Sequence, residues 1–94
     1  MPYELRLKRS VIKDLRRIGR KAAEEIMATI RRTLLADPRG AGRPLKGHDG
    51  ILWRFRSGDY RVIYAFDDDT LIVLVVRVGG RKDVYKNLDS IRVK

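Results

Sequence analysis

The residues best suited to chemistry in this chain are two arginines expected to face each other across a β-hairpin. Residues 53–64 alternate in side-chain character on both sides of Ser57-Gly58, which predicts two antiparallel strands joined by that two-residue turn. In that register Arg54 lies opposite Arg61. Like charges placed directly opposite each other destabilise a sheet, so we expect the chain to hold this pair for an anion, with phosphate the leading candidate. The same register pairs Arg56 with Asp59 and Phe55 with Tyr60.

A second group of reactive residues follows the glycine pair at 79–80, where the backbone can turn sharply. From there Arg81 and Tyr85 would reach the edge of the face that carries Arg54 and Arg61. Arginine binds phosphate through two parallel hydrogen bonds, stays charged at any working pH, and can stabilise a pentavalent phosphorane. Tyrosine can stack on a nucleobase or serve as a general base where cations favour its ionised form. Since RNA supplies its own nucleophile, the 2′-hydroxyl, these residues predict a metal-free phosphodiester site.

The alternation also assigns the two faces of the hairpin. One face carries the arginines, and we expect it to be open at least near the turn; the other is aromatic, and we expect it to pack on helices. The alternative is that the arginines lie on a solvated face or pair with Asp59 and the aspartates at 67–69. The predicted arginine face holds Leu52, Arg54, Arg56, Arg61, Ile63 and Ala65, and the aromatic face holds Trp53, Phe55, Tyr60, Val62, Tyr64 and Phe66.

Composition narrows the function classes. The chain has 94 residues, which predicts a single domain over 1–94, and a net charge of +10, which favours nucleic acid as the partner. An acidic protein, an anionic membrane surface or a merely basic soluble domain are the alternatives. There is no cysteine and one histidine, His48, so we expect no metal and no cofactor. No signal-like or membrane-spanning apolar run is present, so we expect a cytoplasmic protein without membrane contact.

The elements that must position these residues follow a β-α-α-β-β-β order. We expect Ser10 to cap the first helix, Gly19 to end it, and a second helix to run from about 20 to 35. Residues 36–50 are expected to form a loop, the aspartates at 67–69 a solvated turn, and the glycines at 79–80 the end of the last strand. Helices on one face of a mostly antiparallel sheet make this an α+β domain. The expected strands are 3–8, about 52–56, about 60–66 and about 71–78, with a short turn or strand around 84–88.

Three segments together resemble the RelE branch of the RelE/ParE toxin superfamily. They are Leu45-Lys46-Gly47, the run at 52–64 and the run at 78–85, and the order of elements also matches, so the resemblance covers essentially the whole chain. It implies a RelE-like α+β fold and the toxin of a type II toxin–antitoxin pair. Such toxins are ribosome-dependent mRNA interferases that use the 2′-hydroxyl as nucleophile in the A site and leave a 2′,3′-cyclic phosphate.

The resemblance also implies roles for individual residues. Arg61 and Arg81 would stabilise the phosphate in the transition state, Tyr85 would be the general base or stacking residue, and Arg54 would lie near the scissile phosphate. Lys46, Arg56 and Lys82 would bind RNA. The implied partners are the ribosome, mRNA and a cognate antitoxin that blocks or displaces the active site; the toxin alone would be a monomer and would form a hetero-oligomer with the antitoxin.

The sequence departs from well-studied active relatives at two positions. Leu52 stands where they carry a second lysine, and Gly80 where many have histidine or lysine. His48 lies outside the usual catalytic positions and is interpreted as a loop histidine. Two other functions stay open: a ParE-like DNA gyrase inhibitor that does no chemistry, and a non-catalytic basic nucleic-acid-binding module.

Overall fold

The fold is a five-stranded sheet with a helical hairpin on one side, and the computed structural model describes residues 3–81, 83–85 and 88. The strand order is β1-β5-β4-β3-β2, and the α+β class is confirmed. Only β1 pairs in parallel, with β5; the other pairs are antiparallel. The strands are β1 (Glu4–Leu7), β2 (Arg43–Pro44), β3 (Trp53–Ser57), β4 (Tyr60–Asp67) and β5 (Ile72–Gly80).

The helical hairpin forms as the sequence predicts, with one correction at its start. Helix α1 (Arg9–Ile18) ends at Gly19, whose φ of +97° suits glycine, and α2 (Arg20–Thr29) continues into a π-helical turn, η1 (Ile30–Leu34). Ser10 does not cap α1, because the helix already begins at Arg9 and Lys8 occupies the N-cap position. The Ser10 hydroxyl instead donates to the carbonyl of Val76 on β5 at 3.2 Å.

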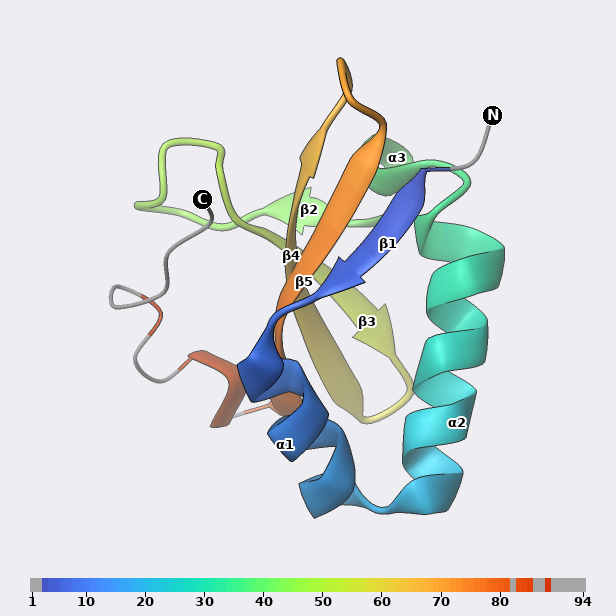
Figure 1. The fold of residues 1–94 in the computed structure, drawn as a ribbon. Coiled ribbons are helices and arrows are strands. Elements are labelled where there is room, and N and C mark those ends of the chain that lie inside the picture. The colour runs from blue at the N-terminus through green and yellow to red at the C-terminus, as the bar shows by residue number, and fades with distance from the viewer. Residues whose placement is uncertain (1–2, 82, 86–87, 89–94) are drawn as a thin grey trace.

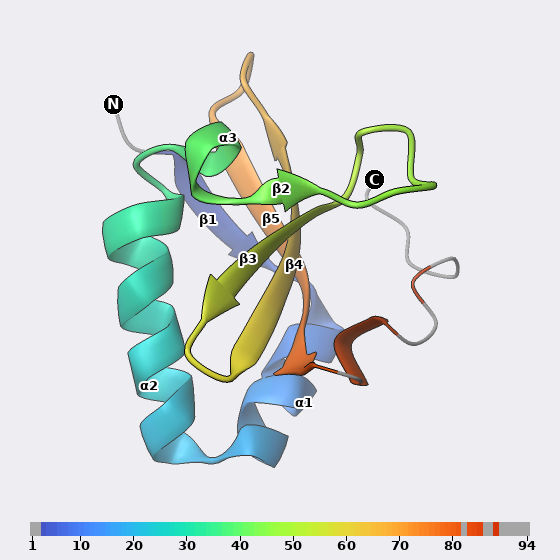
Figure 2. The ribbon, with the colours of Figure 1, turned by 180° about the vertical axis from the view of Figure 1, so that it is seen from behind.

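Helix α2 and the aromatic face of the sheet form the main core, as the alternation predicts. Phe55, Val62 and Tyr64 are buried there against Ile26 and Ile30 of the second helical segment. Period-2 alternation along β3 and β4 sends these side chains to one side of the sheet, where α2 lies (Figure 2).

The opposite face of the sheet is not simply open, which corrects the prediction for the arginine face. A second apolar cluster covers part of it, formed where the short 3₁₀ helix η2 (Asp83–Tyr85) meets the sheet. Both views show α2 and η2 on opposite sides of the sheet (Figures 1 and 2). The buried members of this cluster are Leu52, Ile63, Val76, Val84 and Leu88.

The predicted loop at 36–50 contains two short elements. Asp37 accepts a hydrogen bond from the backbone of Gly40 and caps helix α3 (Pro38–Ala41), with Pro38 at its first position. Strand β2 then pairs with β3. The expected solvated turn after β4 is present, and there the Asp67 carboxylate accepts the Asp69 N–H at 2.8 Å.

Candidate active site

The hairpin that carries the arginines forms, but its turn lies one residue later than predicted. Ser57 pairs with Tyr60, so the two loop residues are Gly58 and Asp59. Gly58 has a φ of +60°, and type II′ hairpin turns place glycine at the first loop position for this reason. The prediction put Gly58 second, which shifted every pair.

The corrected register still opposes two arginines, but a different two. Arg61 faces Arg56 rather than Arg54, and Arg54 faces Ile63. The faces themselves do not change, because the correction moves each residue's partner by two positions and side chains alternate with period 2. Arg54, Arg56 and Arg61 therefore share one face of the hairpin, as predicted.

Arg61 is the most enclosed of these cations. It is only 7 % exposed, and its Nη1 donates to the carbonyl of Tyr60 at 3.4 Å. Its cross-strand neighbour on β5 is Gly79, which has no side chain to fill the space beside it. Among the described residues no carboxylate forms an ion pair with Arg61. A cation held in place without a counter-charge suits an incoming anion.

Arg54 and Tyr85 come together from distant parts of the chain. The Arg54 Nη1 donates to the Tyr85 hydroxyl at 3.3 Å. Tyr85 is 37 % exposed on η2, while the preceding residue, Val84, is fully buried in the second apolar cluster. The buried valine thus anchors the short helix and presents the tyrosine ring toward Arg54.

Arg81 lies at the end of β5 beside the hairpin turn. The glycines at 79–80 do not break the strand as predicted; β5 continues through Gly80, which pairs with Tyr60. Because the main chain stays extended, Arg81 is delivered next to the residues that follow Gly58 and is exposed. It shares this end of the sheet with Arg56, which is also exposed.

The structure does not bring all of the predicted RNA-binding residues to the hairpin end of the sheet. Lys46 is exposed in the loop between β2 and β3, next to Leu45, which packs on the second apolar cluster. Lys82 lies outside the described residues. Leu52 shares the face of Arg54 but is only 4 % exposed, so the position at which the resemblance implies a lysine is part of the apolar packing here.

One buried carboxylate near the site was missed as a functional candidate. Asp14 of α1 accepts the backbone N–H of Val78 at 3.0 Å and is 6 % exposed. Its only signal in the sequence is the spacing of four residues from Ser10, which puts both side chains on the same side of the helix.

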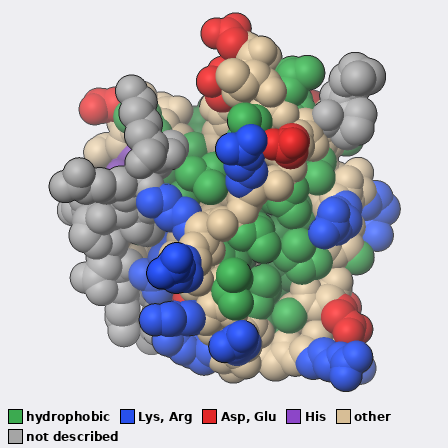
Figure 3. Space-filling model, viewed as in Figure 1, with side chains coloured by type: hydrophobic (Ala, Val, Ile, Leu, Met, Phe, Trp, Pro, Cys, Tyr) green, Lys and Arg blue, Asp and Glu red, His purple; other side chains and the backbone are tan. Residues whose placement is uncertain are grey.

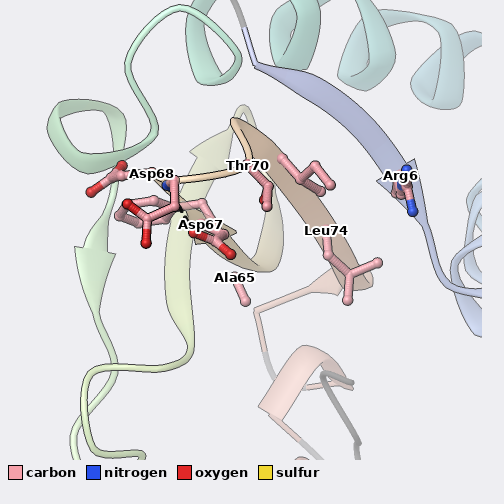
Figure 4. A pocket seen from close by; sticks show the side chains of 9 residues that line it. Arg6, Ala65, Asp67, Asp68, Thr70 and Leu74 are labelled. Atoms are coloured by element: carbon pink, nitrogen blue, oxygen red, sulfur yellow. Dashed lines mark hydrogen bonds between the residues drawn. The ribbon is translucent and has the colours of Figure 1, made fainter.

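A hollow at the other end of the sheet does not suit phosphate. It measures about 740 Å³ and includes the aspartates of the turn after β4 (Figure 4). Hydrogen bonds from the Tyr3 hydroxyl and then from Arg39 lower the pKa of Asp68, so this carboxylate stays ionised. Its lining residues are Arg6, Ala65, Phe66, Asp67, Asp68, Asp69, Thr70, Ile72 and Leu74.

We call Arg54, Arg61, Arg81 and Tyr85 the arginine–tyrosine group. The surface beside this group is strongly basic. Figure 3 shows Lys and Arg side chains gathered over the region of α1. Helix α1 has four exposed basic residues: Arg9, Lys13, Arg16 and Arg17. Within the described residues no group of three or more His, Cys, Asp or Glu could hold a metal ion, and no helix has the length and apolar character needed to cross a membrane.

Comparison with known proteins connects this geometry to one group of proteins. The model of the family described as ParE toxin of type II toxin-antitoxin system, parDE, matches residues 5–85. The chain is 32% identical to toxin RelE of Mycobacterium tuberculosis over 85 residues, which is 90% of this chain and 88% of that protein. It is 28% identical to toxin RelG of the same organism over 86 residues, covering 92% of this chain and 99% of that protein.

Solved structures show the same fold. The toxin–antitoxin complex RelBE2 of M. tuberculosis contains a chain with a TM-score of 0.80 and 26% identity, covering 88% of this chain and 95% of that one. The intact RelBE toxin–antitoxin complex of E. coli gives a TM-score of 0.66 and 27% identity, covering 83% of this chain and 95% of that one.

Proposed function

The chain belongs to the ParE toxin family of type II toxin–antitoxin systems, within the RelE/ParE superfamily, and from this premise we propose that it is a ribosome-dependent endoribonuclease. Its substrate would be mRNA in the ribosomal A site, and cleavage would stop translation. A ribosomal target would place the protein in the cytoplasm. The observation that carries the proposal is the group formed by the enclosed Arg61, the Arg54–Tyr85 hydrogen bond and Arg81 at the end of β5.

The reaction needs no metal in this proposal. The 2′-oxygen attacks the adjacent phosphorus and loses its proton, the bond to the 5′-oxygen breaks, and that oxygen takes up a proton as it leaves. The products are a 2′,3′-cyclic phosphate and a free 5′-hydroxyl. Arg61 and Arg81 would stabilise the additional charge on the phosphorane. Arg61 is already enclosed, so it would need little reorganisation during the step, and Arg81 would reach the phosphate from the exposed end of β5.

Tyr85 and Arg54 would act together on the nucleophile side. The phenol oxygen would accept the proton of the 2′-hydroxyl, and the ring would stack on the neighbouring base. Arg54 would hold the phenol in place and contact the phosphate, because a guanidinium has several donors in one plane. Arg56, Lys46 and Lys82 would bind RNA phosphates away from the reacting bond.

Primer extension on an mRNA in a purified translation system tests this function. We expect discrete stops within codons when the protein is present, and their loss in the double variant Arg61→Ala, Arg81→Ala. The matched control is Arg31→Ala, Arg32→Ala, which removes the same charge from exposed positions on η1. Equal cleavage by both double variants would show that the site residues are wrongly assigned.

The second candidate function is that of a ParE-like gyrase inhibitor. The family match and the buried apolar Leu52, where active relatives have lysine, favour it. It predicts intact mRNA in the same assay together with loss of DNA supercoiling by gyrase. A basic nucleic-acid-binding module would leave both reactions unchanged.

We also propose a cognate antitoxin as partner, because the similar M. tuberculosis and E. coli chains were solved in toxin–antitoxin complexes. The toxin alone would be a monomer. Light scattering on the toxin purified with and without the product of a small neighbouring gene would detect the hetero-oligomer, and stops in the primer-extension assay should disappear in its presence.

A further inference from the structure

Side chains of α1 take over the edge of β5 where strand β1 ends. The main-chain hydrogen bonds between the β1 segment and β5 end with the one from the Lys8 N–H to the Val75 carbonyl at 3.0 Å. Beyond it, the Ser10 hydroxyl donates to the Val76 carbonyl at 3.2 Å, and the Asp14 carboxylate accepts the Val78 N–H at 3.0 Å. Two side chains one helical turn apart thus continue the hydrogen bonding of the strand.

A β-bulge explains why side chains are needed here. Tyr64 pairs with Val75 and Ile63 with Arg77, which leaves Val76 as an extra residue in β5. A bulge bends the strand and changes which backbone groups face each side. The last residues of β5 are therefore turned away from the line of β1 and toward α1, and their free N–H and carbonyl groups meet Ser10 and Asp14.

Burying the Asp14 carboxylate costs free energy of desolvation, which is a high cost for a single hydrogen bond to the Val78 N–H. A buried carboxylate must be compensated by hydrogen bonds or a cation. Asp14 has the Val78 N–H and lies 3.5 Å from the Nε of Arg77. Both partners belong to the end of β5, so the carboxylate stabilises that short stretch of strand rather than the helix.

That stretch of strand leads directly into the candidate site. Val78 is followed by Gly79, which faces Arg61 across the sheet. A Cβ on Gly79 would lie 3.7 Å from the backbone nitrogen of Val84, which is an ordinary contact distance, so the backbone of η2 runs beside Gly79 with room for about one methyl group between them. Val84 carries Tyr85, whose hydroxyl accepts the hydrogen bond from Arg54.

We propose that Asp14 is a positioning residue for the arginine–tyrosine group, acting through the end of β5. It would fix Val78 and Gly79, and through them Arg81 and the η2 segment with Tyr85. The proposal rests on the proposed endoribonuclease function for its effect on rate, while its effect on the position of β5 can be measured without any activity. Asp14 would not touch the RNA.

The variants Asp14→Ala and Asp14→Asn separate positioning from charge. Alanine removes the acceptor for the Val78 N–H, whereas the asparagine side-chain oxygen keeps it without the negative charge. We expect Asp14→Ala to lower the cleavage rate at saturating toxin by about tenfold to a hundredfold, since small displacements of reacting groups have effects of this size. The toxin concentration that gives half the maximal rate should change less than about twofold, and Asp14→Asn should restore most of the rate. Asp69→Asn, an exposed carboxylate at the far end of the sheet, is the control.

Amide hydrogen exchange gives the second readout. In Asp14→Ala we expect faster exchange at Val78, Gly79 and Gly80 and a shifted Tyr85 ring resonance, with Val73 and Val75 unchanged. If Asp14→Ala does not fold, Ser10→Ala takes its place, with smaller effects on the same amides, and Asp14→Asn remains the variant that keeps the acceptor.

Three results would overturn the proposal: an unchanged maximal rate in Asp14→Ala, a change confined to the half-saturating concentration, or unchanged exchange at 78–80. If the wild-type protein does not cut mRNA at all, the proposed function fails instead, and the exchange data alone then decide whether Asp14 positions this end of β5.

Discussion

At the scale of single residues, the site divides its cations between a fixed position and exposed ones. Arg61 is enclosed by the sheet, with Gly79 opposite, whereas Arg81 and Arg56 are exposed at the hairpin end. A pre-placed donor such as Arg61 stabilises charge that develops in a transition state without reorganisation, whereas Arg81 would have to be ordered by the bound RNA before it could do the same. Arg56 would bind the substrate backbone. Tyr85 can contribute in two ways, because its ring can stack on a base and its hydroxyl oxygen can accept a proton.

Replacing Tyr85 separately by phenylalanine and by alanine distinguishes these two roles. We expect Tyr85→Phe, which keeps the ring, to lower the cleavage rate at saturating toxin by about a hundredfold or more, the usual contribution of a general base. The reason is the contact of its hydroxyl with Arg54 at 3.3 Å, which places the oxygen rather than the ring edge at the site. Single-turnover cleavage on stalled ribosomes measures the rate. A wild-type rate for Tyr85→Phe together with a loss in Tyr85→Ala would leave stacking as its role.

At the scale of elements, the position of β3 depends on a close approach by the segment before it. Tyr64, in the main core, donates its hydroxyl to the Pro38 carbonyl at 2.5 Å and so ties α3 to the sheet. Gly42 follows α3, and a Cβ there would lie closer than 3.0 Å to both the Tyr64 hydroxyl and the Arg54 carbonyl. The absence of a side chain at residue 42 therefore lets β2 pair with the strand that carries Arg54.

Gly42→Ala should destabilise the protein by roughly 2–3 kcal/mol, because an inserted methyl group must displace backbone as well as a buried ring. Urea unfolding followed by circular dichroism measures this free energy. Gly80→Ala is the control, since a Cβ at that position meets no atom within 4 Å. Equal stability of the two variants would mean that the chain between α3 and β3 can shift without cost.

Tyr64 also predicts a loss of stability at high pH. Burial, and secondly the charge of Asp37, raise the pKa of Tyr64 well above its ordinary value of 10.0. Above pH 10 the unfolded chain releases this proton while the folded protein keeps it, so stability falls as pH rises, by about 1.4 kcal/mol per pH unit for one group. We expect the free energy of unfolding of Tyr64→Phe to decline less steeply between pH 10 and 12 than that of the wild type. Parallel declines would contradict this.

The same elements show what the sequence could and could not predict. Alternation along β3 and β4 gave the correct faces, because side-chain direction is a local property of the strand. The predicted strand pairing was wrong, because it placed the turn one residue too early. Ser57-Gly58 and Gly58-Asp59 are both acceptable two-residue loops, and only the backbone conformation of Gly58 decides between them. The enclosure of Arg61 could not be seen either, because Val84 and Leu88, which help cover this face, come from a segment without a regular pattern.

At the scale of the whole molecule, the excess of positive charge is placed where it can extend the site. The net charge is +10, and the turn after β4 concentrates negative charge at the opposite end of the sheet. Helix α1 is fastened to the end of β5 by Ser10 and Asp14. Lys13 and Arg17 each follow one of these residues by three positions, so they neighbour them on the helix surface and lie on the side of α1 that borders β5.

This placement predicts that α1 binds phosphates of the RNA around the cleaved bond. The variant Lys13→Gln, Arg17→Gln should weaken binding to ribosomes at low salt and reduce the slope of log affinity against log salt by about 1.5, the value for two lost phosphate contacts. Its cleavage rate at saturating toxin should stay within about twofold of the wild type, because neither side chain belongs to the arginine–tyrosine group. The control is Arg31→Gln, Arg32→Gln, which removes the same charge from exposed positions on η1. If both double variants lower the slope equally, the ribosome responds to the net charge of the protein and not to the surface of α1.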